Sequence, residues 1–269
     1  MDSYRISVQS QLVEVFLTVT KDDRWIPNLR ASDFRLTEDG STVPIVRIDN
    51  QGVPLQIALL FDVSESIRDS LPTIRDAIVA FVESLNREDR IALVLFNSEI
   101  AVHSQPTDDR EPILKAIRNA RAGGITRLND AIVLGLRLLK DKGRRKAMVC
   151  FTDGQDTSGT TPRMVARKAA TQSGYPIYAI GTGAGLELAS LKAILHDFAE
   201  ISGGRAFFIQ NLGRLREVFV GVAAELRSAY VLYYYTQVPP DGRWHELKVQ
   251  TNDPQYSVHS RSGFFAAAE

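Results

Sequence analysis

Apolar and polar positions follow two different periods along the middle of the chain. Between Pro54 and about Arg227, short apolar runs of strand length are separated by stretches in which apolar residues recur at helical spacing. The expected strands are LQIALLF (55–61), RIALVLFN (90–97), KAMVCFT (146–152), YPIYAIG (175–181) and GGRAFFIQ (203–210). The expected helices cover 71–85, 110–120, 128–142, 162–174, 188–203 and 212–229.

This alternation is typical of βα units stacked into an α/β fold. Because the expected strands are almost continuously apolar, we predict that helices cover both faces of their sheet. The result is a doubly wound, mainly parallel sheet, a class that binds ligands at the carboxyl ends of its strands. The segment SEIAVHSQP (98–106) follows the second strand without a crossover helix, so we predict that it adds an antiparallel strand at an edge.

The two ends of the chain have a period of two instead. Residues 4–20 place Val13, Val15, Leu17 and Val19 on one face, and further strand patterns follow at 33–49, 230–238, 243–251 and 256–265. Neither end has enough strands to be stable alone. We therefore predict a small discontinuous β-domain made of 1–53 and 229–269, beside an α/β domain of 54–228.

Composition narrows the functional classes. The 269 residues are 44% hydrophobic and 24% charged, and 32 Lys and Arg balance 32 Asp and Glu, so no global field favours nucleic acid or an anionic membrane. Cys150 is the only cysteine, which excludes an intramolecular disulfide, and we expect it to be buried. No run is long enough to cross a bilayer. The start, MDSYRISVQSQ, lacks the basic and apolar regions of a signal peptide.

Three polar loops are expected at one edge of the sheet. DVSES (62–66) follows the first strand, GGITRLNDA (123–131) precedes the third helix, and TDGQD (152–156) follows the third strand. Residues just past the carboxyl ends of parallel strands converge, although they are distant in sequence. The side chains predicted to surround one small volume are those of Asp62, Ser64, Ser66, Thr126 and Asp153.

Two carboxylates and three hydroxyls form an all-oxygen ligand set. Such ligands suit hard cations, so we expect Mg²⁺ or Mn²⁺ rather than Ca²⁺, and not zinc or copper, which favour imidazole and thiolate. In an extended or looped backbone, every second side chain of Asp-x-Ser-x-Ser can point the same way. With only two anionic groups, the cation would stay electrophilic and would accept waters or a carboxylate from outside.

This arrangement resembles the von Willebrand factor type A (VWA) domain and its metal-ion-dependent adhesion site. The resemblance covers about residues 54 to 228 and rests on Asp-x-Ser-x-Ser, the threonine of GGIT and the aspartate of TDG. It implies that Ser64, Ser66 and Thr126 bind the metal directly and that Asp62 and Asp153 act largely through water. A Glu or Asp of a partner protein would fill the open position.

The flanks resemble a narrower group of bacterial VWA-related proteins described mainly from Acidobacteria. The matching segments are VFLTVTKDDRWIPNLRASDFRLTEDG before the α/β domain and LRSAYVLYYYTQVPPDGRWHELKVQ after it, together with RSGFF. Members of that group usually carry an export signal, which implies a location outside the cytoplasm.

Two neighbouring acids have alternative interpretations. Glu65 is expected to point away from the flanking serines, as a solvated side chain or as a contact that shapes partner selectivity. Asp130 is expected to be a favourable charge in the first turn of a helix, with support of the metal site as the alternative.

Two functions are compatible with these residues. The first is a divalent-cation-dependent protein-binding module, used in adhesion or as a scaffold and without catalysis. The alternative is a Mg²⁺-dependent phosphoryl-transfer hydrolase on the same sheet, which would require a nucleophilic or strongly acidic cluster. The sequence favours the module, because no Gly-x-Ser-x-Gly turn surrounds Ser64 and no histidine is placed to activate it. The sequence does not indicate an oligomeric state or the identity of the partner.

Overall fold

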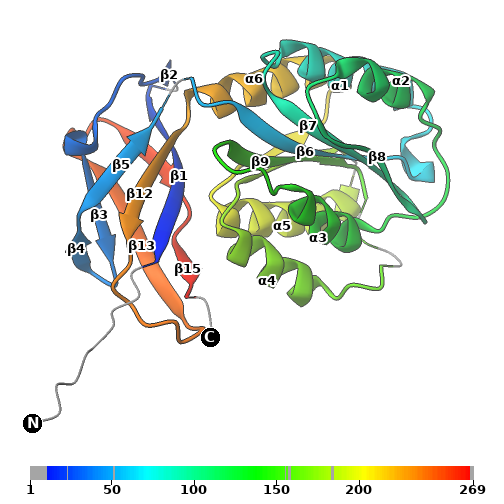
Figure 1. Cartoon of the computed structure of the whole chain (residues 1–269). Helices are drawn as coiled ribbons and strands as arrows, with labels where there is room; N and C mark the ends of the chain where they lie inside the picture. Colours follow the sequence, from blue (N-terminus) through cyan, green and yellow to red (C-terminus); the bar gives the residue numbers. More distant parts are fainter. Residues whose placement is uncertain are drawn as a thin grey trace, which may run out of the picture.

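The computed structural model describes residues 11–22, 24–50, 52–154, 156, 159–182 and 185–266. Figure 1 shows two parts, an α/β body and a β-sandwich. The six-stranded sheet of the body has the order β11 (Ala206–Ile209), β10 (Ile177–Thr182), β9 (Arg145–Thr152), β6 (Leu55–Asp62), β7 (Arg90–Phe96) and β8 (Ile100–Thr107). All neighbours pair in parallel except β8, which lies antiparallel to β7 at the edge as predicted.

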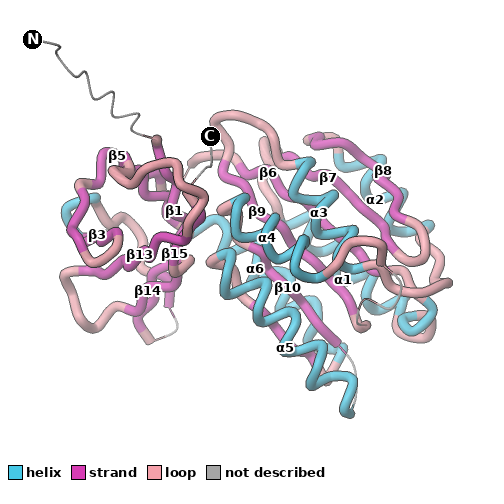
Figure 2. The backbone as a smooth tube through the Cα atoms, turned by 90° about the horizontal axis from the view of Figure 1, so that it is seen from below, coloured by secondary structure: helices cyan, strands magenta, loops and turns pink. Residues whose placement is uncertain are grey.

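Helices cover both faces of this sheet, as the apolar strands predict. On one face lie α1 (Leu71–Ser84), α2 (Arg110–Asn119) and α6 (Leu215–Ser228), which share a core cluster with alternate residues of β6. On the other face, in front in Figure 2, lie α3 (Leu128–Leu138), α4 (Arg163–Ser173) and α5 (Gly185–Ser202). Every residue of β6 is buried, so its register against β7 and β9 fixes where its last residue, Asp62, lies.

The β-sandwich is built from both ends of the chain. One sheet has the order β14 (Ser257–Ser260), β1 (Leu12–Lys21), β12 (Tyr230–Tyr235), β5 (Ile45–Asp49), with β2 (Arg24–Trp25) paired to β1. The other has the order β15 (Gly263–Phe265), β13 (Trp244–Thr251), β3 (Phe34–Glu38), β4 (Ser41–Val43). Val13, Val15, Leu17 and Val19 face the sandwich core, as their alternation predicts. The expected strand at 4–20 begins outside the described residues.

The sandwich contacts the end of the α/β sheet at which the central strand β6 begins (Figure 1). Three residues of the sandwich strands, Phe16, Val231 and Tyr233, pack in the core cluster of the α/β body. The two parts therefore share apolar packing. Arg145, only 5% exposed, donates from Nε to the carbonyl oxygen of Val53 at 3.2 Å and from Nη1 to that of Ala229 at 2.8 Å. Arg145 thereby holds both chain segments that connect the two parts.

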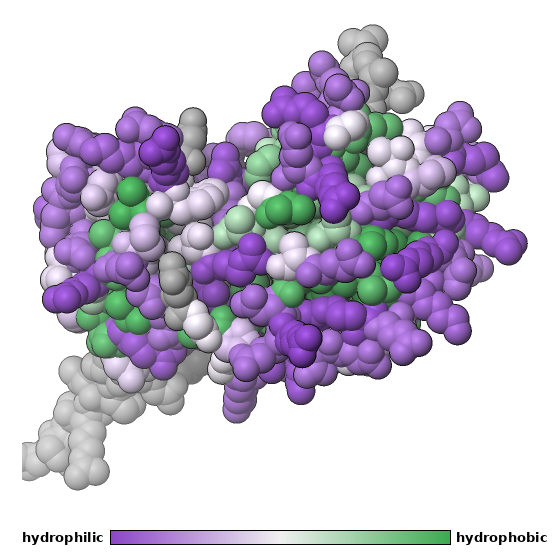
Figure 3. All heavy atoms as spheres, turned by 90° about the horizontal axis from the view of Figure 1, so that it is seen from above, coloured by the Kyte–Doolittle hydropathy of each residue, from purple (hydrophilic) through white to green (hydrophobic). Residues whose placement is uncertain are grey.

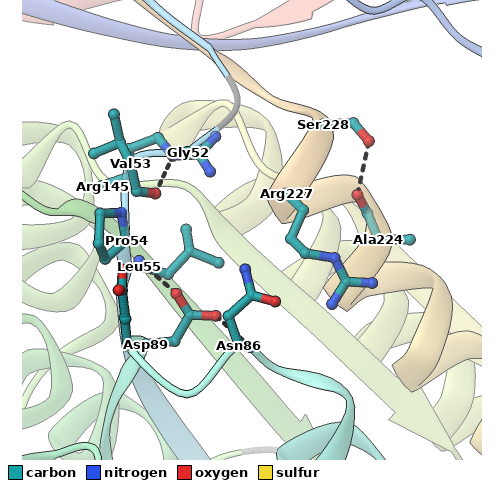
Figure 4. Close-up of a pocket in the computed structure, with 11 residues that line it drawn as sticks. Gly52, Val53, Pro54, Leu55, Asn86, Asp89, Arg145, Ala224, Arg227 and Ser228 are labelled. Carbon is teal, nitrogen blue, oxygen red and sulfur yellow. Dashed lines mark hydrogen bonds between the residues drawn. The ribbon is translucent and has the colours of Figure 1, made fainter.

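Polar residues also surround a cavity of about 490 Å³ at this junction (Figure 4). The buried carboxylate of Asp89 accepts hydrogen bonds from the backbone N–H groups of Leu55 and Asn86, both at 2.8 Å. These contacts fix the start of β6 at the end of the sheet opposite its final residue, Asp62.

Some element boundaries differ from the predictions. The expected strand 256–265 is two strands, β14 and β15, which belong to different sheets. The expected helix 128–142 ends at Leu138, and the backbone N–H of Asp141 donates to the side chain of Gln56 at 3.0 Å. Cys150 is buried as expected, and burial raises the pKa of its thiol.

Polar side chains cover most of the face seen in Figure 3, with apolar ones between them. No helix in the described part of the chain has the length and apolar character needed to span a membrane.

Candidate metal centre

The ends of β6 and β9 bring the first and third predicted loops together. These strands pair in parallel up to Phe61 and Phe151, so the residues that follow lie side by side. Asp62 is fully buried, and its two carboxylate oxygens accept from the N–H of Ser64 at 2.8 Å and from the hydroxyl of Thr152 at 2.5 Å. The carboxylate is therefore fixed in orientation before any ligand binds.

The two serines of DVSES point the same way. Their hydroxyl oxygens lie 3.1 Å apart, and Ser66 donates to Oδ1 of Asp153 at 2.7 Å. Ser64 is buried and extended, whereas a short 3-10 helix, η2 (Glu65–Ile67), begins at the next residue. The prediction allowed an extended or looped backbone, and in this backbone the two hydroxyls converge.

The loop that carries Thr126 is tied to the DVSES loop through its backbone. Gly123 donates to the carbonyl of Val63, and Glu65 donates to that of Gly124, both at 2.9 Å. Gly124 has φ +76°, and a Cβ there would lie 2.3 Å from the hydroxyl of Ser98, so this position requires glycine. The second glycine of GGIT thus allows the loop to approach β7 closely.

Thr126 is buried next to the third loop. An ideal Cβ built on Gly154 would lie 3.0 Å from Oγ1 of Thr126, which places this hydroxyl beside the residue that follows Asp153. The structure therefore brings all three predicted loops, with Asp62, Ser64, Ser66, Thr126 and Asp153, to one edge of the sheet.

The charge of this cluster suits a cation. Burial raises the pKa of Asp62 to about 6, hydrogen bonds from Thr152 and Ser64 oppose this, and the nearby negative charge of Asp153 adds to it. Two carboxylates held close together destabilise each other when ionised, and a cation between them would offset this repulsion. The donors are all oxygen, as Mg²⁺ and Mn²⁺ require.

No group of three or more His, Cys, Asp or Glu able to hold a metal occurs within the described residues. The predicted ligand set contains two carboxylates and three hydroxyls instead. The residues present therefore fit a hard divalent cation and do not fit a zinc site built on imidazole or thiolate.

Glu65 is exposed. Its carboxylate forms a bidentate ion pair with Arg68, with both N–O distances at 2.6 Å, and Arg68 also donates to the carbonyl of Ala122 at 3.1 Å. A role of Glu65 in partner selectivity stays a prediction.

Asp130 connects the start of α3 to the segment that contains Thr160 and Thr161. Its carboxylate accepts hydrogen bonds from the N–H groups of Thr160 at 2.9 Å and Thr161 at 3.0 Å, from both threonine hydroxyls, and from Arg127. Burial on its own would raise the pKa of Asp130, but the hydrogen bonds from Thr161, Thr160 and Arg127 outweigh it and lower the pKa to about 2. Asp130 lies in the first turn of α3, as expected.

Two contributors were not predicted from the sequence. Thr152 holds the Asp62 carboxylate, and the signal that could have identified it is a hydroxyl at the last position of a buried strand, directly before Asp153. Asp156 accepts from the N–H of Asn129 at 2.7 Å and from that of Gly159 at 2.7 Å, so it connects the third loop to the start of α3.

Comparison with known proteins agrees with this geometry. The family profile of the von Willebrand factor type A domain matches residues 56–220. A UPF0353 protein of Mycobacterium sp. is 23% identical over 200 residues, which cover 63% of this chain and 60% of that protein. The chain spans between 28% and 60% of the length of the curated relatives it matches.

One solved structure of similar fold aligns with nearly the whole chain, and others align with about two thirds of it. A von Willebrand factor type A protein from Catenulispora acidiphila aligns with 97% of this chain and 74% of its own, with a TM-score of 0.57 and 14% identity. Proximal thread matrix protein 1 of the mussel byssus, with a zinc-occupied MIDAS motif, aligns with 66% of this chain and 48% of its own (TM-score 0.55, 21% identity). The pilus tip protein Mfa5 domain from Porphyromonas gingivalis aligns with 64% and 94% (TM-score 0.53, 14% identity).

Proposed function

Because this chain belongs to the von Willebrand factor type A domain family, we propose that it is a divalent-cation-dependent protein-binding module without catalytic activity. The metal ligands are Asp62, Ser64, Ser66, Thr126 and Asp153, and an Asp or Glu of a partner protein completes the coordination. The observation that carries the proposal is the convergence of Ser64, Ser66 and Asp153, with 3.1 Å and 2.7 Å between successive side-chain oxygens.

Each residue has a distinct part in this proposal. The hydroxyls of Ser64, Ser66 and Thr126 bind the cation as neutral donors, while Asp62, fixed by Thr152, and Asp153 supply negative charge largely through water. Once bound, the cation would offer an open position that attracts an external carboxylate. Two carboxylates against a divalent cation leave no excess negative charge, so the site would not repel an acidic partner.

The alternative is a Mg²⁺-dependent phosphoryl-transfer hydrolase. Such an enzyme needs an activated nucleophile or a base that orients water, together with a cation aimed at the phosphate. No histidine is among the partners that the structure describes for Asp62, Ser64 or Ser66, and the nearby Arg68 and Arg127 are paired with Glu65 and Asp130. These contacts favour binding over phosphoryl transfer.

We further propose that the protein acts outside the cytoplasm. Support comes from the resemblance of its flanks to exported bacterial VWA-related proteins and from its structural likeness to a domain of a pilus tip protein. A role in adhesion or as a scaffold would fit that location.

Thermal melting with EDTA, Mg²⁺, Mn²⁺ or Zn²⁺ tests the metal assignment. At a hundredfold excess of metal over its dissociation constant, binding stabilises the native state by about 2.7 kcal/mol. At roughly 2 to 4 °C per kcal/mol, the melting temperature of the wild type should rise by roughly 5 to 10 °C. Zn²⁺ is included because the mussel protein of similar fold holds it.

Variants separate the site from general effects of metal. Ser64→Ala with Asp153→Asn should abolish the response, whereas Asp76→Asn, which removes an exposed carboxylate on α1, should keep it. A response that survives the double substitution would disprove the ligand assignment. Turnover of a generic phosphate ester, lost in Asp62→Asn, would favour the hydrolase instead.

A further inference from the structure

A groove of about 540 Å³ lies between the edge strand β8 and the helix α2, which Figures 1 and 2 both place side by side. Its floor is apolar and includes Val63, Ala101 and Ala116, and Lys115, Asn119 and Arg121 line it from the helix side. Its volume is within the range of binding pockets in proteins, and its open shape suits a chain segment better than an enclosed small molecule.

One end of the groove is formed by the loops of the candidate metal centre. Val63 lies between Asp62 and Ser64, and its carbonyl oxygen accepts the 2.9 Å hydrogen bond from Gly123. Arg121 lies where the chain leaves α2 and approaches Thr126. Val63 and Arg121 thus place one end of the groove beside the loops of the candidate metal centre.

The cations of the groove differ from those on the other sides of the metal centre. Arg68 is paired with Glu65, and Arg127 with Asp130, at 2.6 Å and 2.9 Å. In the described part of the chain, neither Lys115 nor Arg121 forms an ion pair, and both side chains are exposed. Glu99 is the one acid among the described residues that line the groove, so its fixed charge is positive overall.

We propose that this groove binds an extended acidic segment of the partner protein, continuous with the carboxylate that completes the metal site. The inference rests on the proposed function and adds the chemistry and the direction of the partner. The metal would bind the first acidic side chain, and the apolar floor would contact small side chains. Arg121 and Lys115 would pair with further acidic side chains. Arg68 and Arg127 are already paired and would contribute less on the other sides.

The dimensions set the spacing of these acids. The ten residues of α2 span about 15 Å, at 1.5 Å per residue. An extended segment covers this length in about four or five residues, at about 3.3 Å each. Acids at alternate positions after the metal-binding residue would therefore reach Arg121 and Lys115 in turn.

Two capped synthetic peptides test this proposal on the whole isotope-labelled protein in millimolar Mg²⁺. Asp-Ala-Glu-Ala-Glu carries the metal-binding acid and two acids for the groove, and Asp-Ala-Gln-Ala-Gln keeps only the first. Amide chemical shifts should change at Ser66 and Gly154 with both peptides, and at Ala101, Lys115 and Ala116 with the acidic one. We expect the acidic peptide to bind at least fivefold more tightly.

Charge reversal in the groove should remove this preference. Lys115→Glu with Arg121→Glu should reduce the affinity for the acidic peptide to that for the neutral one or below it. Arg118→Glu makes the same kind of change on an exposed position of α2 that does not line the groove, and it should retain most of the preference. These side chains are exposed, so equal melting temperatures in EDTA will verify that the variants fold.

Failure of the groove proposal and failure of the metal-dependent module would give different results. Equal affinities, with shifts confined to the metal loops, would overturn the groove proposal and leave the metal-dependent module intact. Groove shifts that persist in EDTA would show a site independent of the metal and would also overturn it. Absence of any shift with either peptide in Mg²⁺, although Mg²⁺ itself binds, would contradict both proposals.

Discussion

The two ends of the α/β sheet both gather buried polar groups, but these groups are satisfied in different ways. At the junction with the β-sandwich, Arg145 donates to the carbonyls of Val53 and Ala229, and Asp89 accepts from the backbone of Leu55 and Asn86. The charged side chains there are hydrogen-bonded to neutral backbone groups, Arg145 to carbonyl oxygens and Asp89 to N–H groups.

At the metal edge, acidic and hydroxyl oxygens face one another. Ser64, Ser66 and Asp153 form a chain of oxygens, and burial together with Asp153 raises the pKa of Asp62. Two neighbouring carboxylates in such a cluster repel each other when ionised, and a cation would offset this repulsion. We expect the junction end to serve stability and the metal end to serve binding, and the following substitutions test that division.

Arg145→Ala should have the largest effect on stability. It removes two hydrogen bonds from a buried charged donor to the segments that connect the two parts, and it leaves a void beside the junction cavity. We expect a loss of about 3 kcal/mol or more in the free energy of unfolding, measured by urea denaturation. The metal-dependent rise in melting temperature should persist, and its disappearance would mean that the two ends are not independent.

Asp130→Asn should cost less and should depend on pH. The folded-state pKa of about 2 lies below the ordinary value of 3.8, so the ionised carboxylate stabilises the fold above about pH 4. This contribution is lost as pH falls through 2. The shift corresponds to roughly 2 kcal/mol at neutral pH.

Denaturation of wild type and Asp130→Asn at pH 7 and at pH 2 measures this difference. The gap in stability between the two proteins should shrink markedly at the lower pH. A gap of constant size would instead indicate that the lost hydrogen-bond geometry, and not the charge, matters.

Glu65→Gln should have the smallest effect. Its ion pair with Arg68 is exposed on both sides, and such pairs contribute little. The melting temperature and the response to Mg²⁺ should both remain as in the wild type. A lost Mg²⁺ response would place Glu65 among the metal ligands, contrary to its pairing with Arg68.

Much of the fold follows from local patterns in the sequence. The continuous apolar run that ends at Asp62 identifies a doubly buried strand, and the alternation of Val13 to Val19 identifies a strand with one buried face. Boundaries were less predictable, because they depend on tertiary contacts. The third helix ends early where Asp141 meets Gln56, a residue 85 positions away in sequence.

The candidate site was predictable because residues that follow the carboxyl ends of parallel strands lie together at one edge of the sheet. Asp62, Ser64 and Asp153 each follow a recognisable apolar run. The role of Thr152 was not predictable, because a threonine within a strand pattern is as compatible with packing as with a hydrogen bond to Asp62. The cationic groove was also missed, because Lys115 and Arg121 come together with β8 only through the packing of α2.

We expect a divalent cation to bind at the end of β6 and β9 and not near the junction. Paramagnetic broadening of amide resonances by substoichiometric Mn²⁺ locates the cation, because broadening falls steeply with distance from the ion. Ser64, Ser66 and Gly154 should broaden first, Leu55 and Ala229 should stay sharp, and Asp153→Asn should suppress the effect. Broadening centred elsewhere, or unchanged in Asp153→Asn, would show that these loops do not bind the cation.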